Sequence, residues 1–531
     1  MSNTNPNPQL VFEKHLPGVP VKYLALFLLI STIIPALSSH AEESLPQTLT
    51  PQVPAQPRIN GPSVFGVRPG SPALYFVPAS GERPMSYQAE KLPAGLRIDS
   101  ETGAITGKLL KAGKYPIVLH AKNSKGEATR NFKIIVGDRI ALTPPMGWCS
   151  WNCMGSSITQ EKILQAARLI VSSGLSQHGY TYVNMDDGWQ GERTGPDHAL
   201  MGNAKFPNLQ DLPAQIHQLG LKAGIYSTPC QISYAKFTGG SSDSEDGKGT
   251  KVEPMHMGKY SFAEADAKQF AAMGLDSVKY DWNITLPPAE EMRKALLASG
   301  RDILFSLSNK APFRDAAKLM QLAEMWRTTG DILDVWKDGD NGGGFGVSEI
   351  AFSQDKWAPY VGPGHWIDPD MLVVGDVKWG KQPLHPTHLT PDQQYSHMSM
   401  WCLLSAPLLI GCDLETIDPF TLGLLTNDEV LAIDQDELGQ QAVRVGSNGP
   451  VDFYSKYLSD DAFALGIFNR GDTPQTVSLS KMNRTMGIWN KTHARDLWRQ
   501  VDVPDFSPKT KFTIPAGGVI LLKVMPNAQR H

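Results

Sequence analysis

Short apolar runs alternate with helix-like segments from Leu142 onward, and this alternation constrains the fold more than any other feature of the chain. Eight of the runs are predicted strands, at residues 147–152, 180–189, 222–229, 277–281, 302–308, 326–331, 365–373 and 408–413. One intervening helix is predicted to begin with a capping box at Ser261-Phe262-Ala263-Glu264, in which each side chain bonds a free backbone N–H. Eight successive strand–helix units predict an α/β fold, a (β/α)8 TIM barrel, over residues 139–436.

Two β-rich regions flank the predicted barrel. Residues 59–138 contain short alternating runs separated by turn residues, a pattern typical of a small β-sandwich. Within them, the segment Leu92-Pro93-Ala94-Gly95-Leu96-Arg97-Ile98-Asp99 resembles the Ig-like modules of secreted bacterial proteins. This region carries no catalytic pattern and is interpreted as a spacer or docking module, with sugar binding as the alternative. Residues 437–531 lose the helical pattern and predict a C-terminal antiparallel β-sandwich domain.

The N-terminus has the order of a secretory signal. Two lysines precede an apolar run over residues 23–37, and a small residue, Ala41, follows at the expected cut. A signal peptide over residues 1–41 predicts a periplasmic or extracellular protein without stable membrane insertion after cleavage. The alternative is a membrane anchor that stays uncleaved, but the apolar run is shorter than the ~20 residues of a span. Four prolines make residues 42–58 a stiff linker.

Charge and cysteine content exclude several classes of protein. The net charge is −4, and Lys and Arg do not cluster as they do on a nucleic-acid surface. An odd number of cysteines, five, excludes a fully paired set within one chain. Cys149 and Cys153 have no second pair or histidine nearby for a zinc site, so we expect mostly buried thiols, with one disulfide left open. The sequence implies no metal and no cofactor, and it carries no signal for an oligomeric state.

Polar and aromatic residues gather where the predicted strands end. Asp281 closes the fourth run and Asp331 the sixth, and a parallel barrel brings such strand ends to one mouth. Two acids facing each other across a pocket can cleave a glycosidic bond. Carboxylates accept hydrogen bonds from sugar hydroxyls, Lys and Arg donate to them, and indole rings pack against sugar C–H groups. The other residues that we expect around this sugar site are Trp151, Asp186, Asp187, Tyr226, Lys279, Ser308, Arg327 and Asp370.

Six ordered motifs carry a family resemblance. They are Leu142-Thr143-Pro144-Pro145-Met146-Gly147-Trp148, Asn184-Met185-Asp186-Asp187-Gly188-Trp189, Gly224-Ile225-Tyr226, Val278-Lys279-Tyr280-Asp281, Trp366-Ile367-Asp368-Pro369-Asp370-Met371-Leu372 and Ser405-Ala406-Pro407-Leu408-Leu409-Ile410-Gly411. Together they resemble glycoside hydrolase family 27, the α-galactosidase and α-N-acetylgalactosaminidase family, over roughly residues 141–525. The resemblance implies a secreted enzyme that hydrolyses terminal α-D-galactosyl residues with retention, by double displacement.

The resemblance also implies roles for individual residues. Asp281 matches the nucleophile and Asp331 the general acid/base. Lys279 matches a donor to the 3- and 4-hydroxyls, and Arg327 a contact near the 2-position. Asp186 and Asp187 match the pair that holds the 4- and 6-hydroxyls, while the positions that match the pocket lining are Trp151, Tyr226, Asp370 and Met371.

Three features depart from the family pattern. Trp282-Asn283 stands where many relatives have Gly-Cys, so Trp282 is expected to narrow the pocket or to contact the leaving group. Small residues at Ser308 and Ala311 resemble the relatives that need room for an acetamido group. An α-N-acetylgalactosaminidase or a β-L-arabinopyranosidase therefore stays open, as does a non-catalytic carbohydrate-binding protein. The long insertion at residues 236–258 is expected either to border the pocket mouth or to be a solvated surface loop.

Overall fold

The structure is a computed structural model that describes residues 48–249, 255–282, 285–337, 344–480 and 492–525. The predicted signal peptide, residues 1–41, lies outside the described residues, as does the start of the predicted linker. Over the described ranges, no helix is both long and apolar enough to cross a membrane. The described part of the linker is bonded to the rest of the chain, because the Leu49 N–H donates to the Tyr395 hydroxyl at 2.8 Å and the Thr50 hydroxyl to the Gly423 carbonyl at 2.7 Å.

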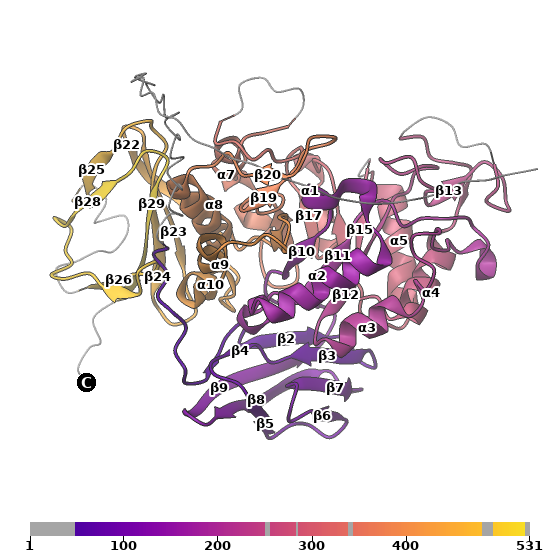
Figure 1. The fold of residues 1–531 in the computed structure, drawn as a ribbon, viewed down its shortest axis with the longest axis horizontal. Coiled ribbons are helices and arrows are strands. Elements are labelled where there is room, and N and C mark those ends of the chain that lie inside the picture. Colours follow the sequence, from indigo (N-terminus) through magenta and orange to yellow (C-terminus); the bar gives the residue numbers. More distant parts are fainter. Residues whose placement is uncertain (1–47, 250–254, 283–284, 338–343, 481–491, 526–531) are drawn as a thin grey trace, which may run out of the picture. The chain divides into compact units, whose positions relative to one another are not determined.

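The centre of the fold is a parallel eight-stranded sheet in the order β18-β17-β16-β15-β12-β11-β10-β21 (Figure 1). A backbone bridge between Leu372, just after β18, and Ile410 in β21 joins the two ends of the sheet into a ring. This confirms the predicted barrel and all eight predicted strands, each shorter than its apolar run. The strands are β10 (Met146–Cys149), β11 (Tyr182–Met185), β12 (Lys222–Ser227), β15 (Ser277–Tyr280), β16 (Leu304–Leu307), β17 (Met325–Arg327), β18 (Trp366–Asp368) and β21 (Leu408–Ile410).

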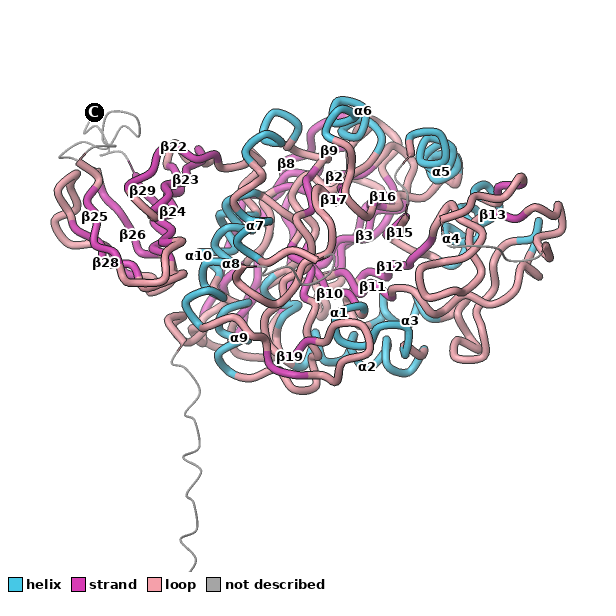
Figure 2. Tube along the Cα trace, turned by 90° about the horizontal axis from the view of Figure 1, so that it is seen from above, coloured by secondary structure: helices cyan, strands magenta, loops and turns pink. Residues whose placement is uncertain are grey.

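Helices surround the strands, as Figure 2 shows from above. The longest, α8, is buried along almost its whole length and begins with a capping box between Thr390 and Gln393. The capping box predicted at Ser261 is wrong, because the helix begins at Ala263 and Phe262 caps it without a side-chain bond. The helices are α1 (Trp151–Met154), α2 (Gln160–Ser172), α3 (Leu212–Gln218), α4 (Ala263–Met273), α5 (Leu286–Ala298), α6 (Ala316–Leu322), α7 (Val347–Ala351), α8 (Pro391–Leu404), α9 (Pro419–Leu425) and α10 (Asp428–Asp434).

Two short hairpins interrupt the strand–helix alternation. Strands β13 (Ser241–Ser242) and β14 (Tyr260–Ser261) pair antiparallel, as do β19 (Asp376–Val377) and β20 (His385–Pro386). The first hairpin closes the long insertion after β12. The second follows β18 and comes shortly before α8.

Residues before the barrel form a β-sandwich of two main sheets, β2-β9-β8-β5 and β3-β7-β6, with Tyr75, Leu119 and Phe132 buried between them. The Ig-like fold predicted for this region is therefore present. Its strands are β1 (Arg58–Ile59), β2 (Val64–Val67), β3 (Pro72–Phe76), β4 (Ala79–Ser80), β5 (Ser86–Glu90), β6 (Leu96–Ile98), β7 (Ala104–Lys108), β8 (Gly113–Asn123) and β9 (Gly126–Val136).

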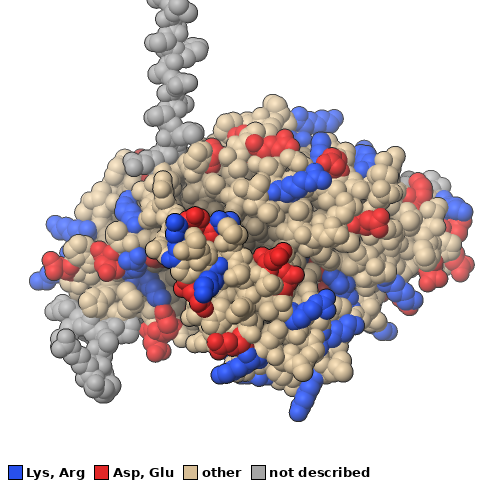
Figure 3. Space-filling view, turned by 60° about the horizontal axis from the view of Figure 1, so that its bottom comes forward, with Lys and Arg blue, Asp and Glu red and all other residues tan. Residues whose placement is uncertain are grey.

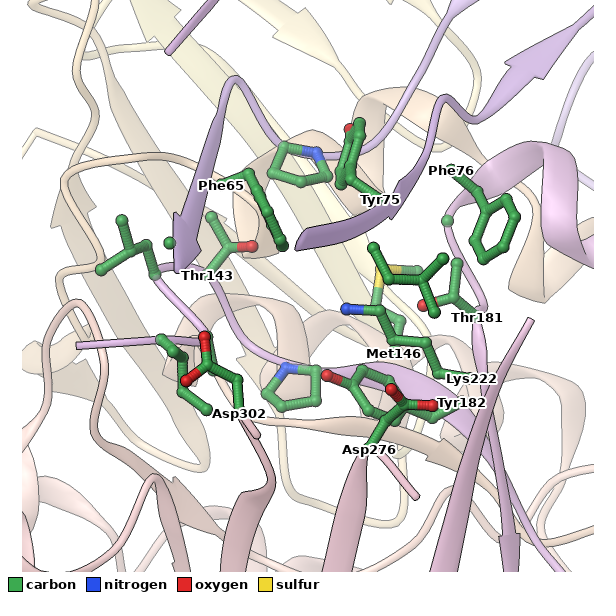
Figure 4. Close-up of a pocket in the computed structure, with 18 of the residues that line it drawn as sticks. Phe65, Tyr75, Phe76, Thr143, Met146, Thr181, Tyr182, Lys222, Asp276 and Asp302 are labelled. Carbon is green, nitrogen blue, oxygen red and sulfur yellow. The ribbon is translucent and has the colours of Figure 1, made fainter. Parts of the chain in front are cut away.

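The sandwich packs on the N-terminal ends of the barrel strands. Arg68 reaches two barrel carboxylates, Asp302 at 3.1 Å and Glu324 at 3.0 Å. A cavity of about 120 Å³ remains between the two domains (Figure 4). Lys222, the first residue of β12, has its ammonium 5.4 Å from the Phe65 ring of the sandwich and 5.3 Å from the Tyr182 ring of the barrel. Burial there lowers the pKa of Lys222.

The C-terminal region is an antiparallel sandwich with sheets β22-β23-β24-β29-β26-β27 and β25-β28. It joins the barrel through α8, where the buried Lys456 ammonium donates to the Cys402 carbonyl at 3.0 Å and the Ser405 hydroxyl at 2.7 Å. Its strands are β22 (Val443–Asn448), β23 (Val451–Tyr457), β24 (Phe463–Asn469), β25 (Gln475–Ser478), β26 (His493–Asp496), β27 (Val501–Asp502), β28 (Lys511–Ile514) and β29 (Val519–Met525).

The distribution of charged side chains and the state of the cysteines match what the composition predicts. On the face drawn in Figure 3, acidic and basic side chains are interspersed and neither sign forms a continuous patch. All five cysteines, which lie within the described residues, are buried free thiols. The disulfide that the sequence left open is therefore not formed.

Candidate active site

One cavity of about 340 Å³ opens where the barrel strands end at their C-termini. The ten residues that the sequence predicts for the sugar site line it, and so does Met371, which matched a pocket-lining position of the family. The ten are Trp151, Asp186, Asp187, Tyr226, Lys279, Asp281, Ser308, Arg327, Asp331 and Asp370. Residues from seven different strand ends thus meet at one place, as the parallel topology requires.

The two predicted catalytic acids occupy different depths of this cavity. Asp281 follows β15 directly, its backbone N–H donates to the Ser227 carbonyl at 2.8 Å, and the residue is only 9 % exposed. The Asp331 side chain, in the loop after β17, is 46 % exposed and accepts a hydrogen bond from Arg327 at 3.2 Å. One carboxyl therefore lies against the protein interior while the other faces the solvent side, where a leaving group would depart.

An ion pair between a partly buried lysine and a buried aspartate stands beside Asp281. The Lys279 ammonium donates to the Asp186 carboxylate at 2.7 Å, and Asp186 also accepts from the Cys149 thiol at 3.3 Å. Burial alone would lower the pKa of Lys279, but the carboxylates of Asp186 and Asp281 outweigh it and raise that pKa overall. Lys279 therefore stays a cation next to Asp281.

Asp187 is a fully buried acceptor in the same wall. Its two oxygens accept from the Ala235 N–H at 2.6 Å and from the Gln190 amide at 2.9 Å. Burial raises the pKa of Asp187 to about 6, although these hydrogen bonds oppose the shift. Asp187 lines the cavity as a hydrogen-bond acceptor, which a sugar hydroxyl can use.

Arg327 bridges two carboxylates, those of Asp331 and Asp370. The guanidinium contacts Asp370 at 2.7 Å and the Gly330 carbonyl at 2.8 Å, in addition to Asp331. Burial opposes its charge, yet the carboxylates of Asp370 and Asp331 raise the pKa of Arg327 overall. Asp370 itself is buried, which raises its pKa to about 6 against the effect of Arg327. The arginine is thereby fixed in one orientation at the cavity edge.

Backbone conformations around the cavity are unusual. Trp282, Asn309 and Asp370 all have positive φ angles, at 65°, 77° and 85°. Non-glycine residues rarely adopt this region, and such residues concentrate at functional sites. Asp370 is held there by the Trp401 indole, which donates to its carbonyl at 2.7 Å.

Sequence reasoning missed part of the lining. Trp151, Tyr234 and Trp282 form an aromatic wall with edge-on ring contacts of 5.6 Å and 5.4 Å, and the sequence pointed to the two tryptophans but not to Tyr234. The other lining residues missed are Asn152, Gly155, Ser156, Ala235, Asn309, Lys378, Trp379, Gly380 and Lys381. Most of them stand in loops without periodicity, and only the indole of Trp379 was a usable signal.

Two sequence-based expectations about the pocket rim need qualification. The described residues of the insertion 236–258 do not line the cavity, whereas Tyr234 and Ala235, just before it, do. Ala311 is buried, donates its N–H to the Arg327 carbonyl at 2.8 Å and does not line the cavity either. Of the two small residues considered for the 2-position, the cavity therefore contains only Ser308.

The barrel and the chemistry of its mouth define the class of the protein, which is a glycoside hydrolase. Comparison with known families then gives the family. Residues 143–436 match the alpha galactosidase A family, and the chain belongs to it. Residues 56–137 match an Ig domain family, and residues 448–524 match the alpha galactosidase C-terminal beta sandwich domain. The resemblance inferred from the sequence motifs is thus confirmed.

Individual relatives agree with this assignment. Alpha-galactosidase 2 of Arabidopsis thaliana is 36 % identical over 373 residues, which cover 69 % of this chain and 85 % of that protein. The protein in one crystal structure from Bacteroides fragilis is 33 % identical in sequence to this chain, and the two folds match with a TM-score of 0.80. The match covers 90 % of this chain and 99 % of that one. Alpha-galactosidase I from Mortierella vinacea is 29 % identical with a TM-score of 0.63, covering 73 % and 98 % respectively.

Proposed function

We propose that the protein is a secreted, retaining exo-α-galactosidase that removes terminal α-D-galactosyl residues from oligosaccharides or polysaccharides. The observation that carries this proposal is that Asp281 and Asp331 line one cavity at different depths. The solvent-facing Asp331 donates a proton to the departing oxygen while Asp281 attacks the anomeric carbon and forms a glycosyl ester. Asp331 then deprotonates a water molecule, which releases the sugar with its original anomeric configuration.

The rest of the cavity supports a sugar substrate. Its volume lies at the small end of the range of about 300–1,000 Å³ for small-molecule sites, which suits a single terminal sugar rather than a chain. Asp186, Asp187 and Lys279 supply acceptors and a donor on one wall, and the aromatic wall stands beside them. The Lys279 cation lines the same cavity as Asp281 and places a positive charge near the proposed nucleophile.

The assay is hydrolysis of 4-nitrophenyl α-D-galactoside by the wild type and three aspartate variants. We expect Asp281→Asn to lower kcat by about 10³-fold or more and Asp331→Asn by about 10²–10⁴-fold. Asp502→Asn, on an exposed strand of the C-terminal sheet, is the matched control and should keep full activity. Equal rates for Asp281→Asn and the wild type would remove the nucleophile assignment, and binding without turnover would identify a carbohydrate-binding protein instead.

Stereochemistry and substrate choice are measured separately. Proton NMR should show α-galactose as the first product, and β-galactose would contradict retention. The small Ser308 favours one second candidate, an α-N-acetylgalactosaminidase, because it leaves space near the 2-position. A panel of α-galactoside, α-N-acetylgalactosaminide and β-L-arabinopyranoside compares the candidates by kcat/KM, and the highest value identifies the glycone.

Secretion is tested on the full chain in a bacterial host. We expect activity in the periplasm or medium and a mature N-terminus at Glu42, because the apolar run and Ala41 have the order of a cleaved signal. An unprocessed chain in the membrane fraction would favour the anchor instead.

A further inference from the structure

Three metal-ligating side chains meet outside the cavity, in a place that the proposed hydrolysis does not use. Asp334, His385 and His388 each offer one ligand atom, and these atoms all lie within 4.8 Å of one another. Two imidazoles and a carboxylate are donors that suit Zn²⁺ and similar transition metals rather than Mg²⁺ or Ca²⁺. We propose that this cluster binds a divalent transition metal ion and that the ion ties together two loops at the cavity edge.

The geometry needs only small changes, because one ligand–ligand distance must widen and the other must shorten. His388 Nδ1 is 2.8 Å from Asp334 Oδ2, and His385 Nδ1 is 3.8 Å from the same oxygen. Ligand atoms around a tetrahedral zinc lie about 3.3 Å apart, given bonds of about 2.0–2.1 Å. Side-chain rotations alone cover this difference, because the two rings already lie close, with centroids 4.6 Å apart.

The backbone that carries the histidines is fixed in place. His385 pairs with Val377 across the β19–β20 hairpin. The next turn is held by Thr387, whose N–H donates to the Gly375 carbonyl and whose hydroxyl donates to the Val373 carbonyl, both at 2.8 Å. A cluster on such a support loses little conformational freedom when a metal binds.

The tautomer of His385 decides which ring nitrogen can bind the ion. His385 Nδ1 also lies 3.0 Å from the Pro386 carbonyl, and it is free to bind the ion when the ring carries its proton on Nε2. Its Nε2 is buried and, among the described residues, has no hydrogen-bond partner. The His388 side chain is 61 % exposed and gives an ion access to the site. Three protein ligands leave the fourth position of a tetrahedral ion to water.

The position of the cluster gives the ion a structural consequence. Asp334 is three residues after Asp331, in the loop that follows β17. The segment between β19 and β20 contributes Lys378, Trp379 and Lys381 to the cavity lining. An ion held by Asp334 and the two histidines would therefore strengthen the contact between the loop of the acid/base residue and the segment that contributes Lys378, Trp379 and Lys381. The binding site itself does not depend on the proposed activity.

The first test is calorimetric titration of the chelator-treated full chain with Zn²⁺ alone. We expect one ion per chain with a dissociation constant of about 1 µM or lower, and at least tenfold weaker binding in His388→Ala and in Asp334→Asn. His493→Ala removes an exposed histidine on β26 and is the matched control, which should bind as the wild type does. No binding, or equal affinity in His388→Ala and the wild type, would overturn the site and leave the cluster as a hydrogen-bonded ion pair.

The second test measures the link between the loops. Trypsin cleavage after Lys378 or Lys381 should slow at least severalfold when Zn²⁺ saturates the wild type, and should not change in His388→Ala. Zinc at about 100 times its dissociation constant should also raise the Tm of the wild type by about 2–3 °C. Tight binding with unchanged cleavage would keep the metal site but refute its action on the rim. Neither readout uses galactoside hydrolysis, so failure here is distinct from failure of the proposed function.

Discussion

Binding of galactose should become tighter as the pH rises from 5 to 7, because of the buried carboxyl of Asp187. Burial raises the pKa of this group to about 6 in the ligand-free protein, from 3.8 in its unperturbed state. Sugar hydroxyls donate hydrogen bonds to the ionised form and so lower that pKa on binding. Galactose therefore binds best to a protein that has already lost the proton.

The size of the effect follows from the shift. Apparent affinity falls by a factor of about 1 + 10^(6 − pH), which is about 11 at pH 5 and about 1.1 at pH 7. The expected change is thus about tenfold, or about 1.4 kcal/mol. The same shift has the opposite sign for folding. The native state binds more protons than the unfolded state between pH 3.8 and about 6, so stability of the ligand-free protein declines as the pH rises through that window.

The assay is calorimetric titration of the Asp331→Asn variant with galactose, a monosaccharide that the enzyme cannot hydrolyse. Buffers of different ionisation enthalpy report whether protons are released on binding. A second variant, Asp187→Asn with Asp331→Asn, should bind more weakly and lose most of the pH dependence. A constant dissociation constant between pH 5 and 7, or proton uptake on binding, would refute the reasoning.

Three further substitutions test other parts of the structure. Lys279→Met leaves Asp186, which is 2 % exposed, without its cation, and denaturant titration should show a loss of about 3 kcal/mol together with a fall in kcat/KM. Unchanged stability would contradict the ion pair. Trp282→Ala removes one ring of the aromatic wall and should raise KM for aryl galactosides about five- to tenfold at similar kcat. Arg68→Met should lower stability by about 2–3 kcal/mol through Asp302 and Glu324 while kcat stays unchanged, and equal Tm values would refute that coupling.

Strand existence was predictable from the sequence, whereas strand ends were not. The second run was predicted over 180–189, but β11 covers only Tyr182–Met185. The predicted strand is too long because the residues that follow a barrel strand are also buried and apolar. Trp189, for example, is fully buried but does not belong to a strand. The capping box failed for a different reason. Ser261 pairs with Ser241 in the β13–β14 hairpin, so its backbone is already committed to a strand.

The residues of the candidate site also fall into those that the sequence could predict and those that it could not. Residues at strand ends, such as Asp281 and Arg327, could be placed because parallel topology brings all such ends to one mouth. Tyr234 and Lys381 could not, because they stand on loops whose path depends on tertiary contacts. The cluster of Asp334 with His385 was also invisible, since its members are far apart in the chain and meet only through the β19–β20 hairpin.

The contact between the N-terminal sandwich and the barrel limits how this architecture can be recombined. A fragment cut at residue 138 would expose the aromatic and lysine surface around Lys222 and would strip Asp302 of its arginine. Exchanging this sandwich for an unrelated domain would therefore require redesign of the barrel surface at the N-terminal ends of its strands. In this protein the N-terminal sandwich and the barrel are therefore expected to depend on each other for stability.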